Sequence, residues 1–133
     1  KYIIIKRNGL KIGVFALDPK LEGLVSKVNY GIIKYLDPIA VANDMATMLK
    51  KKQKCDLVIC ISHLGWEENG MGDQMMIAGS RDIDLVLGGH SHTYFKTLRY
   101  VKNLDGKDIP VDQNGKNAIY VGKMVLDFTQ NKK

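Results

Sequence analysis

Three histidines are the residues of this chain best suited to chemistry near neutral pH. His63 follows an apolar run at residues 55–61, and His90 and His92 follow a second one at residues 83–87. All three lie in glycine-rich loops. Neutral imidazole is the commonest side-chain ligand for ions such as Zn, Mn and Fe, so imidazoles that converge predict a metal site. The alternative is three ordinary loop histidines, each hydrogen-bonded locally.

The elements around the histidines predict how they meet. Residues 55–61 and 83–87 have the apolar pattern of buried strands, and residues 73–78 between them have that of a short amphipathic helix. Such a βαβ unit makes its two strands parallel, and their carboxyl ends then lie about 5 Å apart at one edge of the sheet. We therefore expect the imidazoles to gather at that edge, although His63 and His90 are 27 positions apart.

The rest of the chain predicts one long helix and several more strands. Residues 2–17 predict a hairpin around Asn8-Gly9, followed by a loop over 18–29 and a short strand over 30–35. Asp37 and Pro38 suit the start of a helix that ends at the lysines 50–52. Three further runs, at 97–102, 107–111 and 118–128, predict an antiparallel β-meander. With no repeat and no linker, residues 1–133 read as one α/β unit.

The composition narrows the classes of protein. A chain of 133 residues, 45% hydrophobic and 26% charged, has the size and make-up of one globular domain. No apolar run approaches the ~20 residues that span a bilayer, so we expect no membrane span. The net charge of +6 raises nucleic-acid binding as an alternative. The basic residues are scattered and do not alternate with aromatic ones, as binding of single strands requires.

Other residues near the histidines are weaker candidates. Glu67, Glu68 and Asp73 could reach the site, and Trp66 could cover it or cap the core. Ser62 and Ser91 flank histidines but lack the base and orienting group of a serine nucleophile. The pair Gly88-Gly89 is too short for a phosphate-binding loop, and no Gly-Lys-Ser/Thr motif is present.

Two segments resemble a known family. Residues 55–65, CDLVICISHLG, and residues 83–93, IDLVLGGHSHT, are similar to the calcineurin-like metallophosphoesterases, specifically the 5′-nucleotidase family. Residues 11–17, Asp37-Pro38, 113–115 and 120–123 support the resemblance. It covers essentially the whole chain but only the C-terminal half of that family's catalytic domain. It thus implies that residues 1–133 are a partial domain, the C-terminal half of a four-layer α/β/β/α sandwich, whose N-terminal half is missing.

The resemblance also implies an activity and a ligand set. The activity is hydrolysis of phosphate monoesters of nucleotides with two divalent metal ions of the Zn, Mn, Fe or Mg class. His63 and His90 would bind one ion and His92 the other. The family's upstream Asp-x-His, Gly-Asp and Gly-Asn-His elements are absent, so a partner chain or the missing half would supply the other ligands and the isolated chain would be inactive.

The implied setting is a periplasmic or extracellular protein, in which the nucleotide-specificity domain that follows in this family can be a separate protein. Two alternatives remain open at this point. One is a phosphoesterase-fold module without catalysis, and the other is a basic nucleic-acid-binding domain.

Overall fold

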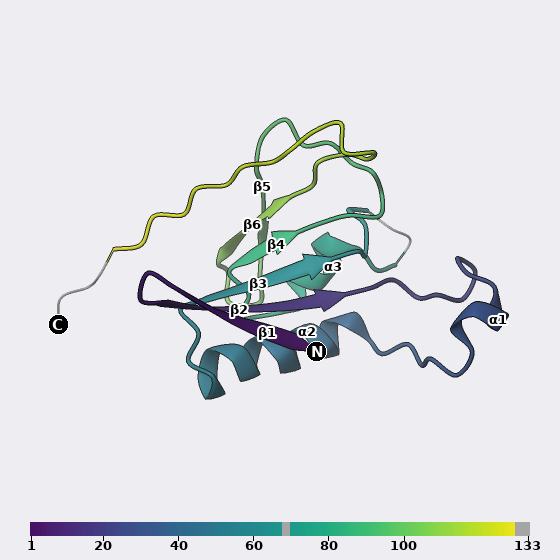
Figure 1. Cartoon of the computed structure of the whole chain (residues 1–133), viewed down its shortest axis with the longest axis horizontal. Helices are drawn as coiled ribbons and strands as arrows, with labels where there is room; N and C mark the ends of the chain where they lie inside the picture. The colour runs from purple at the N-terminus through teal and green to yellow at the C-terminus, as the bar shows by residue number, and fades with distance from the viewer. Residues whose placement is uncertain (68–69, 130–133) are drawn as a thin grey trace.

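A mixed six-stranded sheet forms the centre of the molecule (Figure 1). The structure is a computed structural model that describes residues 1–67 and 70–129. The strand order is β1-β2-β3-β4-β6-β5, in which β2, β3, β4 and β6 run parallel and the two edge strands, β1 and β5, are antiparallel to their neighbours. The strands are β1 (Tyr2–Arg7), β2 (Leu10–Leu17), β3 (Leu57–Ser62), β4 (Leu85–Leu87), β5 (Arg99–Lys102) and β6 (Asp108–Asp112). The predicted α/β class is confirmed.

The first hairpin forms because its two turn residues accept a left-handed backbone. Asn8 has φ +49° and Gly9 has φ +79°, the signs that a two-residue turn needs to match the twist of its strands. The turn sets a register in which Ile3 pairs with Val14 and Ile5 with Ile12. The hairpin predicted around Asn8-Gly9 is therefore confirmed.

The long helix α2 (Pro38–Thr47) begins where the sequence predicts. The Asp37 side chain accepts a hydrogen bond of 2.8 Å from the backbone N–H of Ala40, and Pro38 occupies the first turn, where its missing N–H is harmless. The chain continues as one wider turn, η1 (Met48–Lys52), in which the Gln53 N–H bonds the Met48 carbonyl. The predicted lysine-rich end of the helix is this turn.

Two shorter helices complete the fold. Helix α3 (Asp73–Ala78) crosses from β3 to β4 at the residues predicted for it. Helix α1 (Lys27–Tyr30) lies in the long connection between β2 and α2, which extends away from the sheet (Figure 1). No helix among the described residues is long and apolar enough to cross a membrane.

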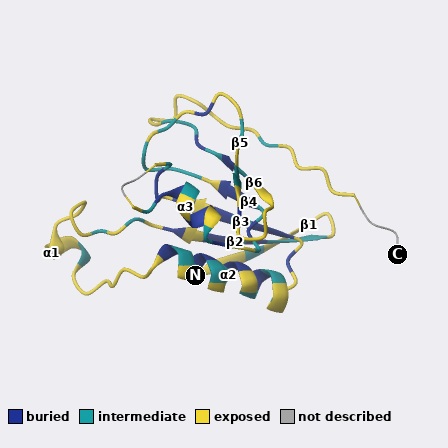
Figure 2. Cartoon of the chain, turned by 180° about the vertical axis from the view of Figure 1, so that it is seen from behind, coloured by how far each residue is buried: buried dark blue, intermediate teal, exposed yellow. Residues whose placement is uncertain are grey.

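The core lies on one face of the sheet. Phe15, Val58, Cys60 and Val86 point to that face and pack with buried residues of the helices and loops. Figure 2 shows dark blue, buried stretches along the middle strands of the sheet. The residues that alternate with them form the opposite face, which is apolar but only partly covered within the described chain. Its exposed side chains are Ile3 (59% exposed), Ile61 (49%), Leu87 (38%) and Tyr100 (61%). We call this the open sheet face.

Two predicted strands do not form. Residues 30–35 are the end of α1 and an irregular segment in which Gly31 has φ +55°, a conformation that breaks a strand. Residues 118–128 have no ladder of strand hydrogen bonds to any described residue. They run as an extended segment beyond β6 (Figure 1). Strand propensity alone cannot hold such a segment without a neighbouring strand.

Candidate functional site

Four parallel strands end at one edge of the sheet, and the histidines follow two of them. Leu17 at the end of β2 is in register with Ser62 of β3, and Leu87 of β4 is in register with Asp112 of β6. The N–H of His63 donates a 2.8 Å hydrogen bond to the Leu17 carbonyl, which extends the β2–β3 ladder by one residue. The edge that the sequence predicts for the histidines is thus the carboxyl edge of the parallel strands, where α/β folds place their ligands.

The side chains of His63 and His90 lie against each other at this edge. Their ring centroids are 5.1 Å apart and their planes meet at 66°. His63 is exposed and His90 is half-buried. A Cβ on Gly89 would lie 3.0 Å from Nδ1 of His63, so the bare glycine backbone is what allows that ring to lie against the loop. The expected approach of these two histidines across 27 positions is therefore observed.

The loop that carries His90 and His92 has an unusual backbone. His90 has φ +76° and His92 has φ +56°, a left-handed conformation that costs non-glycine residues of order 1–3 kcal/mol. Such outliers persist only where the surroundings impose them. His92 is exposed, and within residues 1–67 and 70–129 the three histidines are not grouped as a metal site. No set of three or more His, Cys, Asp or Glu side chains there has that arrangement.

The acidic candidates in the first loop take different places. Glu67 is exposed and accepts a 2.9 Å hydrogen bond from the Gln74 amide, while Glu68 lies outside the described residues. Asp73 is fully buried as the first residue of α3. One of its carboxylate oxygens would lie 2.6 Å from a Cβ on Gly88, so Asp73 sits directly beneath the histidine loop rather than in the solvent beside it.

Burial dominates the electrostatics of Asp73. In the described part of the chain, neither carboxylate oxygen has a hydrogen-bond partner of regular geometry. Burial raises the pKa of the Asp73 carboxyl to about 6, and the neighbouring Ser62 hydroxyl offsets part of the effect. Burial likewise raises the pKa of the nearby Cys60 thiol, with a smaller contribution from the negative charge of Asp73. Cys60 is therefore a neutral core residue.

The residues that flank the histidines mostly have structural roles. Trp66 is half-buried and packs edge-to-face on Phe95, with ring centroids 4.9 Å apart, so it caps the core. The Ser62 hydroxyl accepts a hydrogen bond from the Leu64 N–H, and the Ser91 hydroxyl accepts one from the Trp66 N–H. Neither hydroxyl is bonded to a histidine, as a nucleophilic serine would require.

Sequence reasoning used residues 113–115 only for the family resemblance and assigned no role at the site to the buried amide of Gln113. Gln113 follows β6, is only 1% exposed, and hydrogen-bonds the loop of His90 and His92. The signal that could have found it is its position directly after a strand that ends beside β4.

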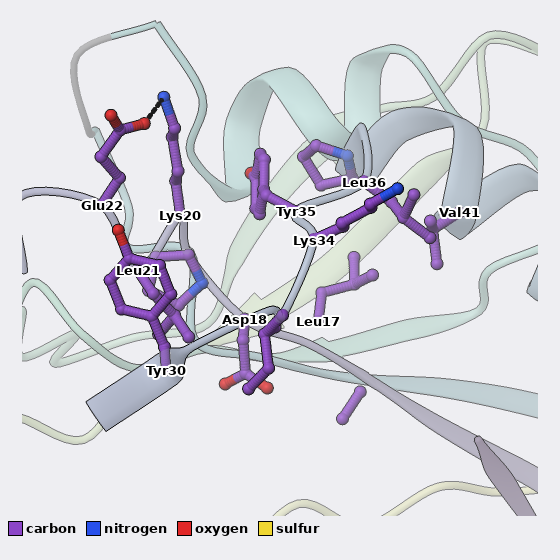
Figure 3. Close-up of a pocket in the computed structure, with 14 residues that line it drawn as sticks. Leu17, Asp18, Lys20, Leu21, Glu22, Tyr30, Lys34, Tyr35, Leu36 and Val41 are labelled. Carbon is purple, nitrogen blue, oxygen red and sulfur yellow. Dashed lines mark ion pairs between the residues drawn. The ribbon is translucent and has the colours of Figure 1, made fainter. Parts of the chain in front are cut away.

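A cavity lies next to this edge but contains none of the histidines (Figure 3). It measures about 480 Å³, at the carboxyl end of β2, between the start of the long connection and the segment before α2. Leu17, Tyr30 and Val41 line it, and Lys20 and Glu22 form an ion pair at its rim. The cavity is mainly apolar, so the histidine edge remains the part of the molecule with the clearest capacity for chemistry.

Several basic side chains are bound to carboxylates of the fold. Lys50 lies 2.6 Å from Asp84 and also donates to the Asp56 carbonyl, while Lys51 pairs with Asp82. Lys107 lies 3.2 Å from Asp84. The lysines at the end of the long helix thus tie it to the start of β4, which accounts for that cluster without nucleic acid.

Comparison with known proteins finds several that are similar to this chain in amino-acid sequence. The chain is 28% identical over 147 aligned positions to an apyrase of Tabanus yao, a match that takes in 98% of this chain and 25% of the apyrase. It is 34% identical over 101 positions to a 5′-nucleotidase of Vibrio cholerae, which takes in 68% of this chain and 18% of the nucleotidase. The chain therefore spans a quarter or less of the length of these relatives. No protein-family model matches it.

Solved structures are similar to the fold. The NAD nucleotidase of Haemophilus influenzae superposes with a TM-score of 0.68 at 26% identity, over 84% of this chain and 24% of that one. The calcineurin-like phosphoesterase YfkN of Bacillus subtilis superposes with a TM-score of 0.64 over 86% of this chain and 41% of that one. Its sequence identity to this chain is 24%, so this match supports the fold alone. By sequence this chain is related to 5′-nucleotidases, the family that its histidine segments resemble. Its fold is similar to that of an NAD nucleotidase and of a calcineurin-like phosphoesterase.

Proposed function

We propose that this chain supplies part of the active site of a metal-dependent phosphoesterase that hydrolyses phosphate monoesters of nucleotides. The observation that carries the proposal is the pair of imidazoles from His63 and His90, whose ring centroids lie 5.1 Å apart at the carboxyl edge of parallel strands. The names of the relatives, apyrase, 5′-nucleotidase and NAD nucleotidase, support a nucleotide as substrate.

The donor set suits part of a metal site. Imidazole nitrogen is a good ligand for Zn, Mn and Fe ions, and His63 is exposed enough to bind one. Imidazoles are neutral ligands, so three of them leave the charge of two divalent cations uncompensated, and no carboxylate joins them in the described chain. In the proposed site His63 and His90 bind one ion and His92 the other, with carboxylates from outside this chain. The ions, when bound, polarise the phosphate and activate water. The role of the three histidines is to hold and orient these ions.

We further propose that residues 1–133 are one part of a larger phosphoesterase domain. The open sheet face supports this, because apolar side chains such as Ile3 and Ile61 are about half exposed on it, whereas sheets of this kind are normally covered on both faces. The relatives are also at least four times longer than their match to this chain. The missing N-terminal half, or a partner chain, then covers the face and completes the site. We place the whole protein in the periplasm or outside the cell, with a nucleotide-specificity domain that is separate from these residues.

A metal-binding experiment on the naturally encoded polypeptide tests the proposal. We expect Mn²⁺ to raise its melting temperature and chelation to lower it, because a ligand that binds the native state stabilises it. The polypeptide should hydrolyse AMP and p-nitrophenyl phosphate only with metal. His90→Asn and His92→Asn should each reduce kcat/KM by more than about 100-fold, above the loss that follows removal of an outer partner of a ligand. Asparagine tolerates the left-handed backbone at both positions.

A control variant and a comparison with and without chelator decide whether the proposal holds. A control, Thr97→Ala, changes an exposed residue beyond the histidine loop and should leave hydrolysis unchanged. Equal melting temperatures with and without chelator would reject metal binding by these histidines.

A second candidate is a non-catalytic module with the same fold. The observation in its favour is that no three-ligand group exists within residues 1–67 and 70–129. The naturally encoded polypeptide would then show no metal-dependent hydrolysis of either ester at any metal concentration, while remaining folded.

A further inference from the structure

The side chain of Gln113 joins both ends of the loop that contains His90 and His92. Its Nε2 donates a 3.1 Å hydrogen bond to the carbonyl of Gly89. Its Oε1 accepts a 2.7 Å hydrogen bond from the Thr93 N–H and a 2.9 Å one from the Ser91 hydroxyl. Gln113 is 1% exposed, so its side chain is shielded from water, and leaving its polar atoms without a partner is costly.

The chemistry of the two backbone groups requires an amide at this position. A carbonyl on one side accepts only, and an N–H on the other side donates only, so the side chain between them must donate at one end and accept at the other. A glutamate keeps the acceptor but places a second oxygen against the Gly89 carbonyl. A methionine has a similar volume and can make neither bond.

The same network reaches the loop of His63. The Ser91 hydroxyl, which donates to Gln113, accepts a 3.0 Å hydrogen bond from the Trp66 N–H and lies 2.8 Å from the Thr93 hydroxyl. Trp66 is three residues after His63. The two loops that present histidines are therefore joined by the Ser91 hydroxyl, which the buried amide of Gln113 on a third segment holds in place.

We propose that Gln113 is a positioning residue of the histidine site. Its hydrogen bonds at Gly89 and Thr93 hold the intervening backbone, with the left-handed conformations of His90 and His92, and so keep the His90 ring beside His63. The role in metal binding rests on the function proposed above, whereas the placement of the rings does not.

The test compares two buried amides in the naturally encoded polypeptide. Gln113→Met removes the three bonds at nearly constant volume. The matched control is Asn103→Leu, because Asn103 is 8% exposed and also organises a loop, accepting hydrogen bonds from the N–H groups of Asp105 and Lys107. That loop connects β5 to β6, at the end of β6 opposite Gln113. Both variants should lower the melting temperature.

Two measurements separate positioning from general stability. Mn²⁺ affinity should fall by about 10–100-fold in Gln113→Met, the usual loss for a partner that orients a ligand, and should change less than about twofold in Asn103→Leu. Without metal, the imidazole NMR resonances of His63 and His90 should shift in Gln113→Met only, because each ring senses the other at 5.1 Å. If Gln113→Met does not fold, Gln113→Glu keeps the acceptor oxygen and should show the same pattern.

Each outcome has one meaning. Unchanged imidazole resonances in a folded Gln113 variant overturn the positioning role. Equal losses of Mn²⁺ affinity in Gln113→Met and Asn103→Leu also overturn it, because the effect is then one of stability. If the unsubstituted polypeptide binds no Mn²⁺ but the resonances shift as expected, the proposed function fails and the positioning role stands.

Discussion

At the scale of single residues, Asp73 shows that the role of a side chain depends on where the fold places it. The sequence places an acidic residue near the histidines, which fits a ligand or a solvated loop residue equally well. In the structure its carboxylate is fully buried beneath Gly88, in contact with the backbone that carries the histidine loop. A sequence pattern locates the residue on the helix α3 but cannot tell which side of the loop its carboxylate occupies.

The buried carboxylate predicts a pH dependence of stability. Burial raises the pKa of Asp73 to about 6, against about 3.9 in an unfolded chain. The protonated form therefore stabilises the fold below about pH 4, and that contribution is lost as the pH rises through 6. Over this range the difference is about 3 kcal/mol. Asp73→Asn, which cannot ionise, should gain stability relative to the unsubstituted protein between pH 4 and 7.

Thermal unfolding of both proteins across that pH range measures the difference. The exposed Asp44 on α2 offers the matched substitution, and Asp44→Asn serves as the control for the loss of one carboxylate charge. A constant gap between Asp73→Asn and the unsubstituted protein would show that the Asp73 carboxyl does not titrate differently on folding.

At the scale of elements, turn and capping residues predicted the structure correctly where a segment is stabilised by contacts within itself. The hairpin at Asn8-Gly9 and the helix start at Asp37-Pro38 are where the turn and capping residues predict them, because these signals act over four residues or fewer. The strand predicted at 118–128 fails for the opposite reason. Its residues favour a strand, but a strand needs a partner, and no described residue pairs with it. The sequence of this chain carries no information on a neighbour outside it.

The cap of α2 gives a prediction at this scale. Asp37→Ala removes the acceptor of the Ala40 N–H, and loss of such a cap costs about 1 kcal/mol. Chemical denaturation should report a lower free energy of unfolding by that amount. Asp44→Ala, an exposed change inside the same helix, should be neutral or slightly stabilising because alanine favours helix. Equal effects of the two substitutions would mean that the cap contributes nothing.

At the scale of the whole molecule, the histidine edge could be predicted from the sequence, whereas the open sheet face could not. The approach of His63 and His90 followed from parallel-strand topology, which the βαβ pattern predicts. The incomplete cover of the sheet could not be predicted from the apolar run of β3, because such a run is typical of a strand buried on both faces. Ile61 of that strand is instead 49% exposed.

A substitution on the open sheet face tests whether more of the protein covers it. Ile61→Lys should lower the melting temperature of the naturally encoded polypeptide, because a lysine beneath a covering layer loses its hydration. Met75→Lys on α3 is the matched control, since Met75 is 50% exposed and faces solvent on the helix side. Wild-type stability of Ile61→Lys would mean that the face stays in water.

The position of Gln113 in the chain has a consequence for biosynthesis. The ribosome releases His63, His90 and His92 before it releases the Gln113 amide, which holds the loop of His90 and His92 and follows His92 by about 20 residues. At translation rates of about 5–20 residues per second, the nascent chain spends on the order of seconds with the histidines free of that restraint. The loop acquires its final form only when β6 has emerged and paired with β4, so this edge of the sheet is completed after β3 and β4 have been made.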